Sequence, residues 1–384
     1  MPLTRRDFLK LAGLSAGAMA FRPFSGIRPA RSWADFPKAD NLGRLTNTLD
    51  LRSAPDVNNP SIGKVYEDSV VEWLREVNAQ TIDINVVNQR WVETPDGYLY
   101  ASHVQPVRNI PNVPYSAIPA GQKGFWAEVT VPYADMVMDN PPPRSPWAKD
   151  ILGRGQSPRV YYSQVIWIDQ IKTGDNGQIL YHFDENGGRA AGATGGGYGD
   201  LFWADGRAFR PITADDVAPI DADVDPKTKI VLVDLTYQTL SCMEGKREVY
   251  FCQCSTGGKF DASGKPVDTW ATGIGEYLTS WKTISIHMTG GTSGAGYDTP
   301  AVSWANFFDA QHGIAIHSAF WHNDFGQAVS HGCVNVSPED AKWIFRWTAP
   351  NITLDLADIR IPMPGGTHVK VGEHADIVSY RRQK

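Results

Sequence analysis

Two short segments of the sequence carry residues that could work together as a nucleophile and its base. One contains His317 at the end of an apolar run, and the other is Ser330-His331-Gly332-Cys333. A thiol attacks a carbonyl efficiently only once it has lost its proton, so a reactive cysteine needs an imidazole beside it. We therefore predict that Cys333 is a nucleophile and that His317 or His331 is its general base. Gly332 would let the backbone approach a substrate carbonyl closely, so that neighbouring N–H groups could stabilise an oxyanion.

Packing and metal binding compete with this interpretation. A lone cysteine in apolar surroundings is usually inert, and a lone histidine is usually a hydrogen-bonded structural group. Here, however, a polar run interrupts two apolar strands, which packing alone does not require. Five candidate zinc ligands fall within a short stretch: His312, His317, His322, His331 and Cys333. Zinc sites usually show close pairs such as C-x-x-C or H-E-x-x-H, and the sequence has neither, so we expect no metal and no cofactor.

The other three cysteines are predicted to be structural. Cys252 and Cys254 alternate along an apolar strand, so they share one face and are expected to pack there as free thiols. With Cys242 as the third, we predict no framework of disulfides. Cys333 is therefore the one cysteine whose surroundings indicate reactivity.

The elements that must position these segments are predicted to be mainly strands. The sequence holds 36 glycines and 26 prolines, and apolar periodicity of helical length is scarce, which favours many short strands and turns. A short helix is expected over 341–347, after Cys333, with Ser337-Pro338 as its cap and first position. The formal net charge of -6, without a basic stripe, argues against a nucleic-acid partner.

The N-terminus carries a segment typical of a targeting signal. Arg5-Arg6 precedes an apolar run of small residues over 11–21, and together they resemble a twin-arginine export signal over 1–21. Residues 22–41 are predicted to be a linker. Such a signal would deliver the protein to the periplasm or cell wall, either released or anchored by an uncleaved signal.

Several domains are expected downstream, because the chain has 384 residues. Residues 42–108 resemble a bacterial Src-homology-3-like module, through Leu51-Arg52-Ser53 and Gly97-Tyr98-Leu99-Tyr100. Prolines predict a connection over 109–158, and strand signals predict a second, diverged small β module over 159–220. These modules could form a wall-binding arm or ordinary structural domains. A compact β domain is predicted over 226–356 and a C-terminal strand and tail over 357–384, so the fold class is mainly β, with small β-barrel modules before the last domain.

Within 226–356, the strand that carries His317 followed by Ser-His-Gly-Cys resembles the L,D-transpeptidase family, with its YkuD-type catalytic domain. The resemblance implies a β-sandwich with a short helix after the nucleophile. It implies that Cys333 attacks a tetrapeptide stem of peptidoglycan, releases D-Ala and passes the thioester to an amine acceptor. His317 is then the base and the Ser318 carbonyl holds its ring. His331 supports the site, and N–H groups of Gly332 and Cys333 bind the oxyanion.

The resemblance also implies a substrate cleft lined by Ser330, Asn335, Tyr297, Trp321 and Trp304. Residues 290–296 are rich in glycine and are predicted to form a flexible lid. Asn335 stands where many members carry arginine, and Ser318 where many carry glycine, so the way in which the substrate carboxylate is held is left open. The implied partners are peptidoglycan stem peptides as donor and acceptor, carbapenem-type inhibitors and, through the small modules, the sacculus.

Two other functions stay open. An L,D-carboxypeptidase of the same fold would pass the thioester to water and so trim stem peptides without cross-linking them. A non-catalytic wall-binding protein would rely on its small β modules alone. The sequence does not choose between a stem peptide, a wall protein and water as the acceptor.

Overall fold

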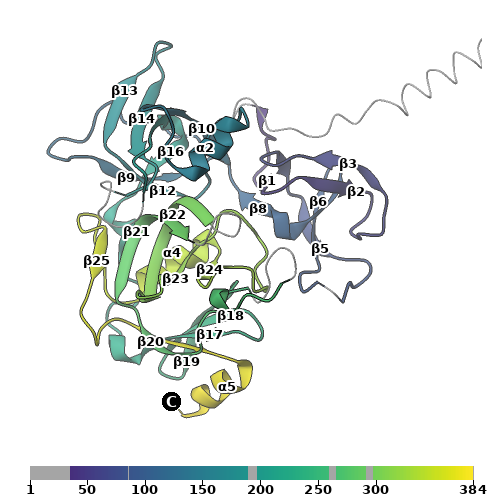
Figure 1. The fold of residues 1–384 in the computed structure, drawn as a ribbon, viewed down its shortest axis with the longest axis vertical. Helices are drawn as coiled ribbons and strands as arrows, with labels where there is room; N and C mark the ends of the chain where they lie inside the picture. The colour runs from purple at the N-terminus through teal and green to yellow at the C-terminus, as the bar shows by residue number, and fades with distance from the viewer. Residues whose placement is uncertain (1–34, 85, 189–196, 259–264, 291–296, 384) are drawn as a thin grey trace, which may run out of the picture.

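The computed structural model describes residues 35–84, 86–188, 197–258, 265–290 and 297–383. The expected export signal over 1–21, most of the linker after it and all but Gly290 of the expected lid lie outside the described residues. Three β bodies follow one another along the chain (Figure 1). No helix in the described ranges is long and apolar enough to cross a membrane.

The first body is a small β module built from two sheets. A five-stranded sheet has the order β3-β2-β7-β6-β5, and a three-stranded sheet has the order β4-β1-β8. Its core holds Leu45, Leu51, Val65, Val92 and Leu99, all nearly inaccessible to solvent. The elements are β1 (Leu42–Leu45), β2 (Leu49–Arg52), β3 (Ser61–Val65), β4 (Val70–Glu72), β5 (Arg75–Asn78), β6 (Arg90–Thr94), β7 (Gly97–Tyr100), the turn η2 (Ala101–His103) and β8 (Val104–Val107).

The second body repeats the first strand by strand. Its sheets have the orders β11-β10-β15-β14-β13 and β12-β9-β16, the same pattern with every number raised by eight. Even the 3-10 turn between the last two strands recurs. The elements are β9 (Phe125–Val129), β10 (Tyr133–Met138), α2 (Pro146–Gly153), β11 (Arg159–Tyr161), β12 (Val165–Ile168), β13 (Gln170–Thr173), β14 (Ile179–Asp184), β15 (Leu201–Asp205), η3 (Gly206–Ala208), β16 (Phe209–Pro211) and α3 (Ala214–Val217).

The prediction that 109–158 is only a connection was therefore wrong. This stretch supplies β9 and β10, each of which pairs with two neighbouring strands, and the second module starts well before residue 159. The prolines fall between elements: Pro132 lies between β9 and β10, and Pro141-Pro142-Pro143 follows β10. A proline at such a position removes no hydrogen bond from a sheet. The high proline content of this stretch therefore suggested a connection, although the prolines do not interrupt either strand.

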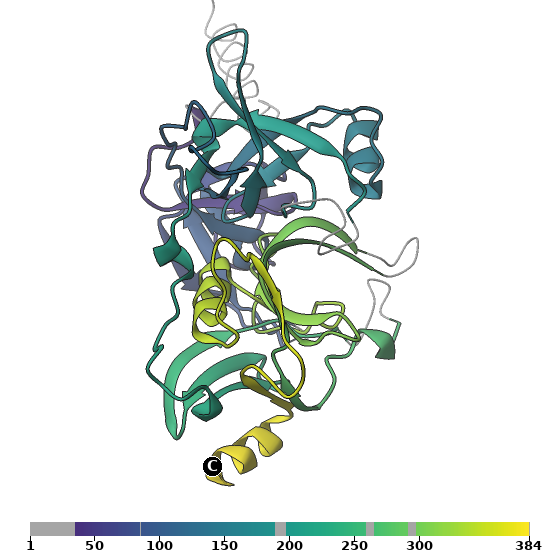
Figure 2. The same ribbon diagram turned by 90° about the vertical axis from the view of Figure 1, so that its left-hand side faces the viewer.

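The third body packs two five-stranded sheets against each other (Figure 2). Their orders are β19-β18-β17-β26-β20 and β24-β23-β22-β21-β25, which confirms the mainly β prediction and the sandwich. The elements are η4 (Pro226–Thr228), β17 (Lys229–Asp234), β18 (Thr239–Glu244), β19 (Arg247–Gln253), η5 (Asp268–Trp270), β20 (Gly275–Leu278), β21 (Trp281–Gly290), β22 (Tyr297–Asp309), β23 (Ile314–Ser318), β24 (Val334–Val336), α4 (Pro338–Trp347), β25 (Asp358–Arg360), β26 (His368–Gly372) and α5 (His374–Gln383).

The third body continues beyond the predicted end at residue 356. β25 pairs with β21, and β26 lies between β17 and β20, so the sandwich extends to Gly372. β26 pairs with β17, which lies more than a hundred residues earlier in the chain. A pairing over that separation cannot be predicted from the local sequence of either strand. α4 begins at Pro338, as the sequence predicted. Ser337 caps the helix, since its Oγ accepts a hydrogen bond from the Asp340 N–H at 3.2 Å.

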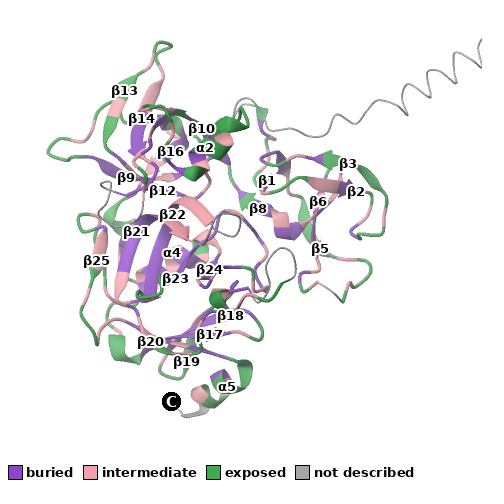
Figure 3. Cartoon of the chain, in the orientation of Figure 1, coloured by how far each residue is buried: buried purple, intermediate pink, exposed green. Residues whose placement is uncertain are grey.

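One core fills the space between the two sheets and α4. Figure 3 shows buried residues along β21, β22 and β23, next to the helix. Ile344 and Phe345 of α4 and Ile316 of β23 belong to this core, as do Cys242, Cys252 and Cys254, which are free thiols. Cys333 is also a free thiol but is only half-buried. The core therefore anchors the strands that carry the candidate nucleophile and base.

Candidate active site

The two reactive segments meet at one edge of the second sheet. β23 ends with His317-Ser318, and β24 begins directly after Cys333. The two strands pair in parallel, with His317 opposite Asn335. The segment that carries the thiol and the segment that carries the imidazole therefore lie at the same end of the sheet. Both side chains open on one pocket of about 340 Å³, lined by Met288, Tyr297, Thr299, Val302, His317, Trp321, Val329, Ser330, His331, Cys333 and Asn335.

His317 is held in the orientation that a base requires. Its ring is 3% exposed, and Nδ1 lies 3.0 Å from the carbonyl of Ser318, the contact expected from the sequence. Because that carbonyl can only accept, Nδ1 carries the proton and the neutral ring keeps its lone pair on Nε2. Burial lowers the pKa of His317 to about 4, so the ring is neutral at physiological pH and can take a proton.

Cys333 is a thiol at rest. Burial raises its pKa to about 11, although a hydrogen bond from the Ala315 backbone opposes the shift. Its Sγ lies 3.6 Å from the carbonyl of Gly313. With the pKa of His317 far below that of Cys333, the resting pair is a neutral thiol and a neutral imidazole. The arrangement therefore favours proton transfer during attack over a preformed thiolate–imidazolium pair.

A chemical consequence is that Cys333 should react with iodoacetamide as an ordinary, high-pKa thiol. We expect its alkylation rate, followed by intact mass, to rise about tenfold per pH unit from pH 7 to pH 10, because the thiolate fraction rises by that factor below the pKa. Cys333→Ala is the control, since the three remaining cysteines are buried and should label slowly. A fast rate that is level across neutral pH would show a preformed thiolate and contradict this assignment.

The turn before Cys333 is fixed by hydrogen bonds that the sequence did not reveal. Ser330 Oγ donates to the Cys333 carbonyl at 2.5 Å and accepts from the Gly332 N–H at 3.1 Å. Thr272 Oγ1, from a loop sixty positions earlier, donates to the Gly332 carbonyl at 2.7 Å. Gly332 has φ +119°, a conformation that side chains rarely adopt. The hydroxyl of Ser330 thus stabilises the turn through these two hydrogen bonds, although Ser330 was expected to bind substrate.

His331 occupies an aromatic setting. Its ring lies 4.1 Å from that of Trp270 and 5.1 Å from that of Tyr297, measured between centroids. Burial lowers its pKa as well. Packing between two aromatic rings fits a supporting position at the rim of the pocket. Among the described residues His331 has no carbonyl partner of the kind that orients His317.

Of the aromatic residues expected in the cleft, the structure places two there. Trp321 lies against His317, with ring centroids 5.8 Å apart, and Tyr297 also lines the pocket. The expectation for Trp304 was wrong, because its side chain is 1% exposed and packs on Phe345 in the core. Ala301 and Trp304 have φ of 51° and 60°, and these departures from extended backbone break the alternation of side chains along β22, which the family resemblance did not anticipate.

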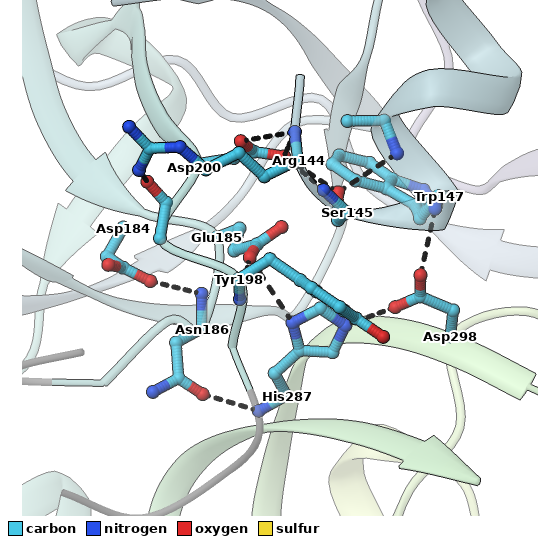
Figure 4. Close-up of polar contacts among 12 residues, drawn as sticks. Arg144, Ser145, Trp147, Asp184, Glu185, Asn186, Tyr198, Asp200, His287 and Asp298 are labelled. Atoms are coloured by element: carbon cyan, nitrogen blue, oxygen red, sulfur yellow. Dashed lines mark hydrogen bonds and ion pairs between the residues drawn. The ribbon is translucent and has the colours of Figure 1, made fainter. Parts of the chain in front are cut away.

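The second module holds one wall of the pocket. That wall is the β21–β22 hairpin, with Met288, Tyr297 and Thr299 facing the pocket. On the hairpin, buried His287 forms a short hydrogen bond through Nε2 to Asp298 (Figure 4). Asp298 accepts from the Trp147 N–H at 2.8 Å, and the His287 N–H donates to Asn186 Oδ1 at 2.9 Å. Since Asp298 adjoins Tyr297, these contacts fix the position of the wall.

Asp298→Ala should therefore weaken catalysis from outside the pocket. The substitution removes the contact with Trp147 and leaves His287 Nε2 without its carboxylate partner, so the hairpin can shift. A misplacement of about 1 Å costs roughly ten- to hundredfold in kcat/KM. D-Ala release from a tetrapeptide stem is the measurement. Asp309→Ala, at the other end of β22 where the carboxylate meets exposed His312, is the matched control and should keep full activity. Equal activity of the two variants would contradict the role given to the second module.

The first module holds the loop that joins His317 to Cys333. Arg44, 3% exposed, donates from Nη2 to the carbonyl of Phe320 at 2.7 Å. Arg90 donates to the carbonyl of Asn323 at 3.0 Å, and the Asn323 N–H donates to the Ser102 carbonyl at 2.8 Å. Both modules therefore contact the walls of the pocket. No local motif in the sequence predicts these contacts.

No metal-binding arrangement is apparent in the described ranges: no three or more histidine, cysteine, aspartate or glutamate side chains are placed to hold an ion. Of the five residues weighed as zinc ligands, His317, His331 and Cys333 line the pocket, and the other two lie outside its lining. His312 pairs with Asp309 at the surface, and His322 contacts Asn335.

Comparison with known families fixes the identity of the third body. Residues 228–371 match the model of the L,D-transpeptidase catalytic domain, YkuD. This part of the chain is an L,D-transpeptidase catalytic domain. The match runs to within one residue of the end of β26, beyond the predicted end at residue 356, and it covers both His317 and Cys333. Neither N-terminal module is assigned to a family by it, so their Src-homology-3-like character stays a prediction.

Solved structures of L,D-transpeptidases are distant from this chain. An Enterococcus faecium L,D-transpeptidase is 21% identical over 38% of this chain and 50% of its own, with a TM-score of 0.28. A Mycobacterium smegmatis L,D-transpeptidase is 16% identical over 50% of this chain and 90% of its own, with a TM-score of 0.30. The LD transpeptidase LdtMt1 in complex with imipenem is 16% identical over the same shares, with a TM-score of 0.29. A search of curated proteins found no match.

Proposed function

We propose that the protein is a peptidoglycan L,D-transpeptidase whose nucleophile is Cys333 and whose general base is His317. The observation that carries the proposal is the shared pocket: inside an L,D-transpeptidase catalytic domain, a thiol and a neutral, oriented imidazole line the same cavity. Substrate, acceptor and cellular role are part of the proposal.

In the first half-reaction the enzyme is acylated. His317 Nε2 takes the thiol proton as Cys333 Sγ attacks the carbonyl that joins the third stem residue to the terminal D-Ala. The Cys333 N–H stabilises the oxyanion, a contribution of about 3 kcal/mol, whereas the Gly332 N–H, expected as a second donor, already donates to Ser330 Oγ. When the tetrahedral intermediate collapses, the C–N bond breaks, the D-Ala amine takes the proton from His317, and a thioester remains on Cys333.

In the second half-reaction an amine of another stem peptide, or of a wall protein, attacks the thioester. His317 takes a proton from that amine and returns it to the thiolate, so the thiol is regenerated and a new amide forms. An acceptor stem peptide gives a 3→3 cross-link. Met288, Val302, Val329 and Trp321 make much of the lining apolar, which limits the access of water and favours an amine acceptor over hydrolysis.

The products distinguish the proposed reaction from its alternatives. Purified protein is incubated with disaccharide-tetrapeptide, and the products are separated and weighed by mass spectrometry. A transpeptidase gives free D-Ala together with 3→3 dimers. Free D-Ala with only tripeptide monomers would instead indicate an L,D-carboxypeptidase, and an unchanged substrate would leave wall binding as the function.

Export by the twin-arginine route would bring the enzyme to this substrate. The support is Arg5-Arg6 before a short apolar run. The enzyme would then act in the periplasm or cell wall, released or anchored by an uncleaved signal. Fractionation of cells, with N-terminal sequencing of the recovered protein, tests both points; recovery only from the cytoplasm would exclude export.

A further inference from the structure

A chain of hydrogen bonds runs from the first module to the floor of the pocket. Ser102, fully buried in the module, donates from Oγ to Asp324 Oδ1 at 2.7 Å, and Asn88 Nδ2 lies 3.3 Å from the same oxygen. The Asp324 N–H donates to His322 Nδ1 at 3.1 Å. The side-chain amide of Asn335, which lines the pocket, lies 3.2 Å from His322 Nε2.

These contacts determine which nitrogen of His322 carries its proton. Because Nδ1 accepts from a backbone N–H, it holds a lone pair, and the proton of the neutral ring must be on Nε2. The ring is neutral at physiological pH, since burial lowers its pKa to about 4. Nε2 is therefore a donor, and it needs an acceptor from Asn335.

The orientation of Asn335 follows from that requirement. The two ends of an amide have the same shape, so the hydrogen-bond network decides which end is which. In the structure Nδ2 is the amide atom 3.2 Å from His322 Nε2, which would set two donors against each other. With the two ends of the amide exchanged, Oδ1 accepts from Nε2 and the NH₂ group is left for the pocket. Within the described residues, the side chain has no hydrogen-bond partner other than His322.

The position of this NH₂ group suits a substrate oxygen beside the scissile bond. Asn335 follows Cys333 by two residues and is the middle residue of β24, and in extended backbone such residues point to the same face. In the proposed reaction the terminal D-Ala carries the carboxylate nearest to the carbonyl that Cys333 attacks. The described lining contains no lysine or arginine, so an oriented amide is a suitable donor for that carboxylate.

We propose that His322 is a positioning residue, which the first module holds in place through Asp324 so that Asn335 presents its NH₂ group to the terminal carboxylate of the donor peptide. This inference rests on the proposed function. It gives the first module a part in substrate selection, because the module supplies Ser102 and Asn88 and grips the same loop through Arg44 and Arg90.

The test compares two donors that differ only at the recognised group. One is a tetrapeptide stem with a free C-terminal carboxylate, and the other is the same stem with a C-terminal carboxamide. The ratio of their kcat/KM values for D-Ala or D-alaninamide release measures carboxylate selection. For the wild type we expect a ratio of roughly ten to a hundred, the effect of one charge-assisted hydrogen bond.

Two substitutions of His322 separate its two nitrogens. In His322→Gln the side-chain amide can place an N–H near the position of Nε2, so Asn335 keeps its donor and the ratio should stay within about threefold of wild type. In His322→Asn the side chain reaches only the position of Nδ1, so the donor is lost and the ratio should fall toward one. Asn335→Ala should also bring the ratio near one, and the double variant His322→Asn with Asn335→Ala should fall no further.

The first module supplies a milder variant and its control. Ser102→Ala removes the donor to Asp324, and its ratio should lie between those of wild type and His322→Asn. Ser61→Ala, at an exposed position of the same module, should match wild type. Should His322→Asn lose its fold in thermal melting, Ser102→Ala carries the test.

The possible outcomes separate this inference from the proposed function. Iodoacetamide labelling of Cys333 should be unchanged in these variants, which shows that the thiol is intact. If the wild type releases D-Ala but His322→Asn and Ser102→Ala keep the wild-type ratio, the positioning role is wrong and the proposed function stands. If the wild type releases no D-Ala, the proposed function fails, and this inference fails with it.

Discussion

Replacing Cys333 with alanine should abolish D-Ala release and dimer formation, by about 10⁴-fold or more. Without the thiol the proposed nucleophile is gone, and water would have to attack a peptide bond directly. The expected measurement is product formation from disaccharide-tetrapeptide by mass spectrometry, with wild type alongside.

Two controls make this result specific. Cys252→Ala removes a thiol that is buried in the core and should keep its activity. The melting temperature of Cys333→Ala should stay near that of wild type, because the thiol is half-buried and its Sγ hydrogen bonds, to the Gly313 carbonyl and from the Ala315 backbone, are weak. If Cys333→Ala and wild type make the same products at the same rate, the mechanism proposed above is wrong.

Replacing His317 with alanine should slow acylation by about 10³-fold, within the range that general bases supply. The same change at His331 should cost about tenfold or less, because its ring packs between Trp270 and Tyr297 and no carbonyl of the described ranges orients it. His317→Gln, which fills more of the buried site, guards against a loss of fold. Rates of D-Ala release at saturating and low donor concentration give the comparison.

The pH profile of His317→Ala gives a second, independent readout. Without a base, only the thiolate attacks, and the pKa of Cys333 is raised to about 11, so the rate should climb about tenfold per pH unit up to that value. The wild type should instead be nearly level above about pH 5, because the pKa of His317 is lowered to about 4 and its ring is neutral there. A similar loss for His317→Ala and His331→Ala, with parallel profiles, would mean that the base has been assigned to the wrong residue.

The reactive centre was the most predictable part of the molecule. His317 and Ser330-to-Cys333 are local motifs, and their polar character within apolar strands marks them before any fold is known. The cap Ser337-Pro338 is also local, and α4 begins there. Local hydrogen-bonding chemistry and strand alternation are enough for such features.

The errors share a physical cause, which is that their determinants are non-local. β26 looks like a tail until β17 pairs with it, and β9 and β10 look like a proline-rich connection until the repeat of the first module is visible. Trp304 leaves the cleft because positive φ values break the alternation of its strand. Thr272, His322 and Asp324 reach the site through contacts across the fold that spacing does not encode.

The two N-terminal modules gain a role from these same long-range contacts. The first module forms hydrogen bonds with the loop between the proposed base and nucleophile, and the second forms hydrogen bonds with the β21–β22 hairpin. A wall-binding arm would need neither contact. Binding to the sacculus can still be part of what the modules do, but their buried polar contacts make them a frame for the pocket.

The most direct test of the central claim is to treat the protein with a carbapenem and weigh it intact. His317 takes the thiol proton as Cys333 Sγ bonds to the lactam carbonyl carbon, and the ring nitrogen receives that proton when the C–N bond opens, so no fragment leaves and the full mass of the drug is added. We predict one adduct per chain, located on Cys333 by peptide mapping and missing from Cys333→Ala. An unmodified protein, or an adduct on any other residue, would contradict the assignment of Cys333 as the nucleophile.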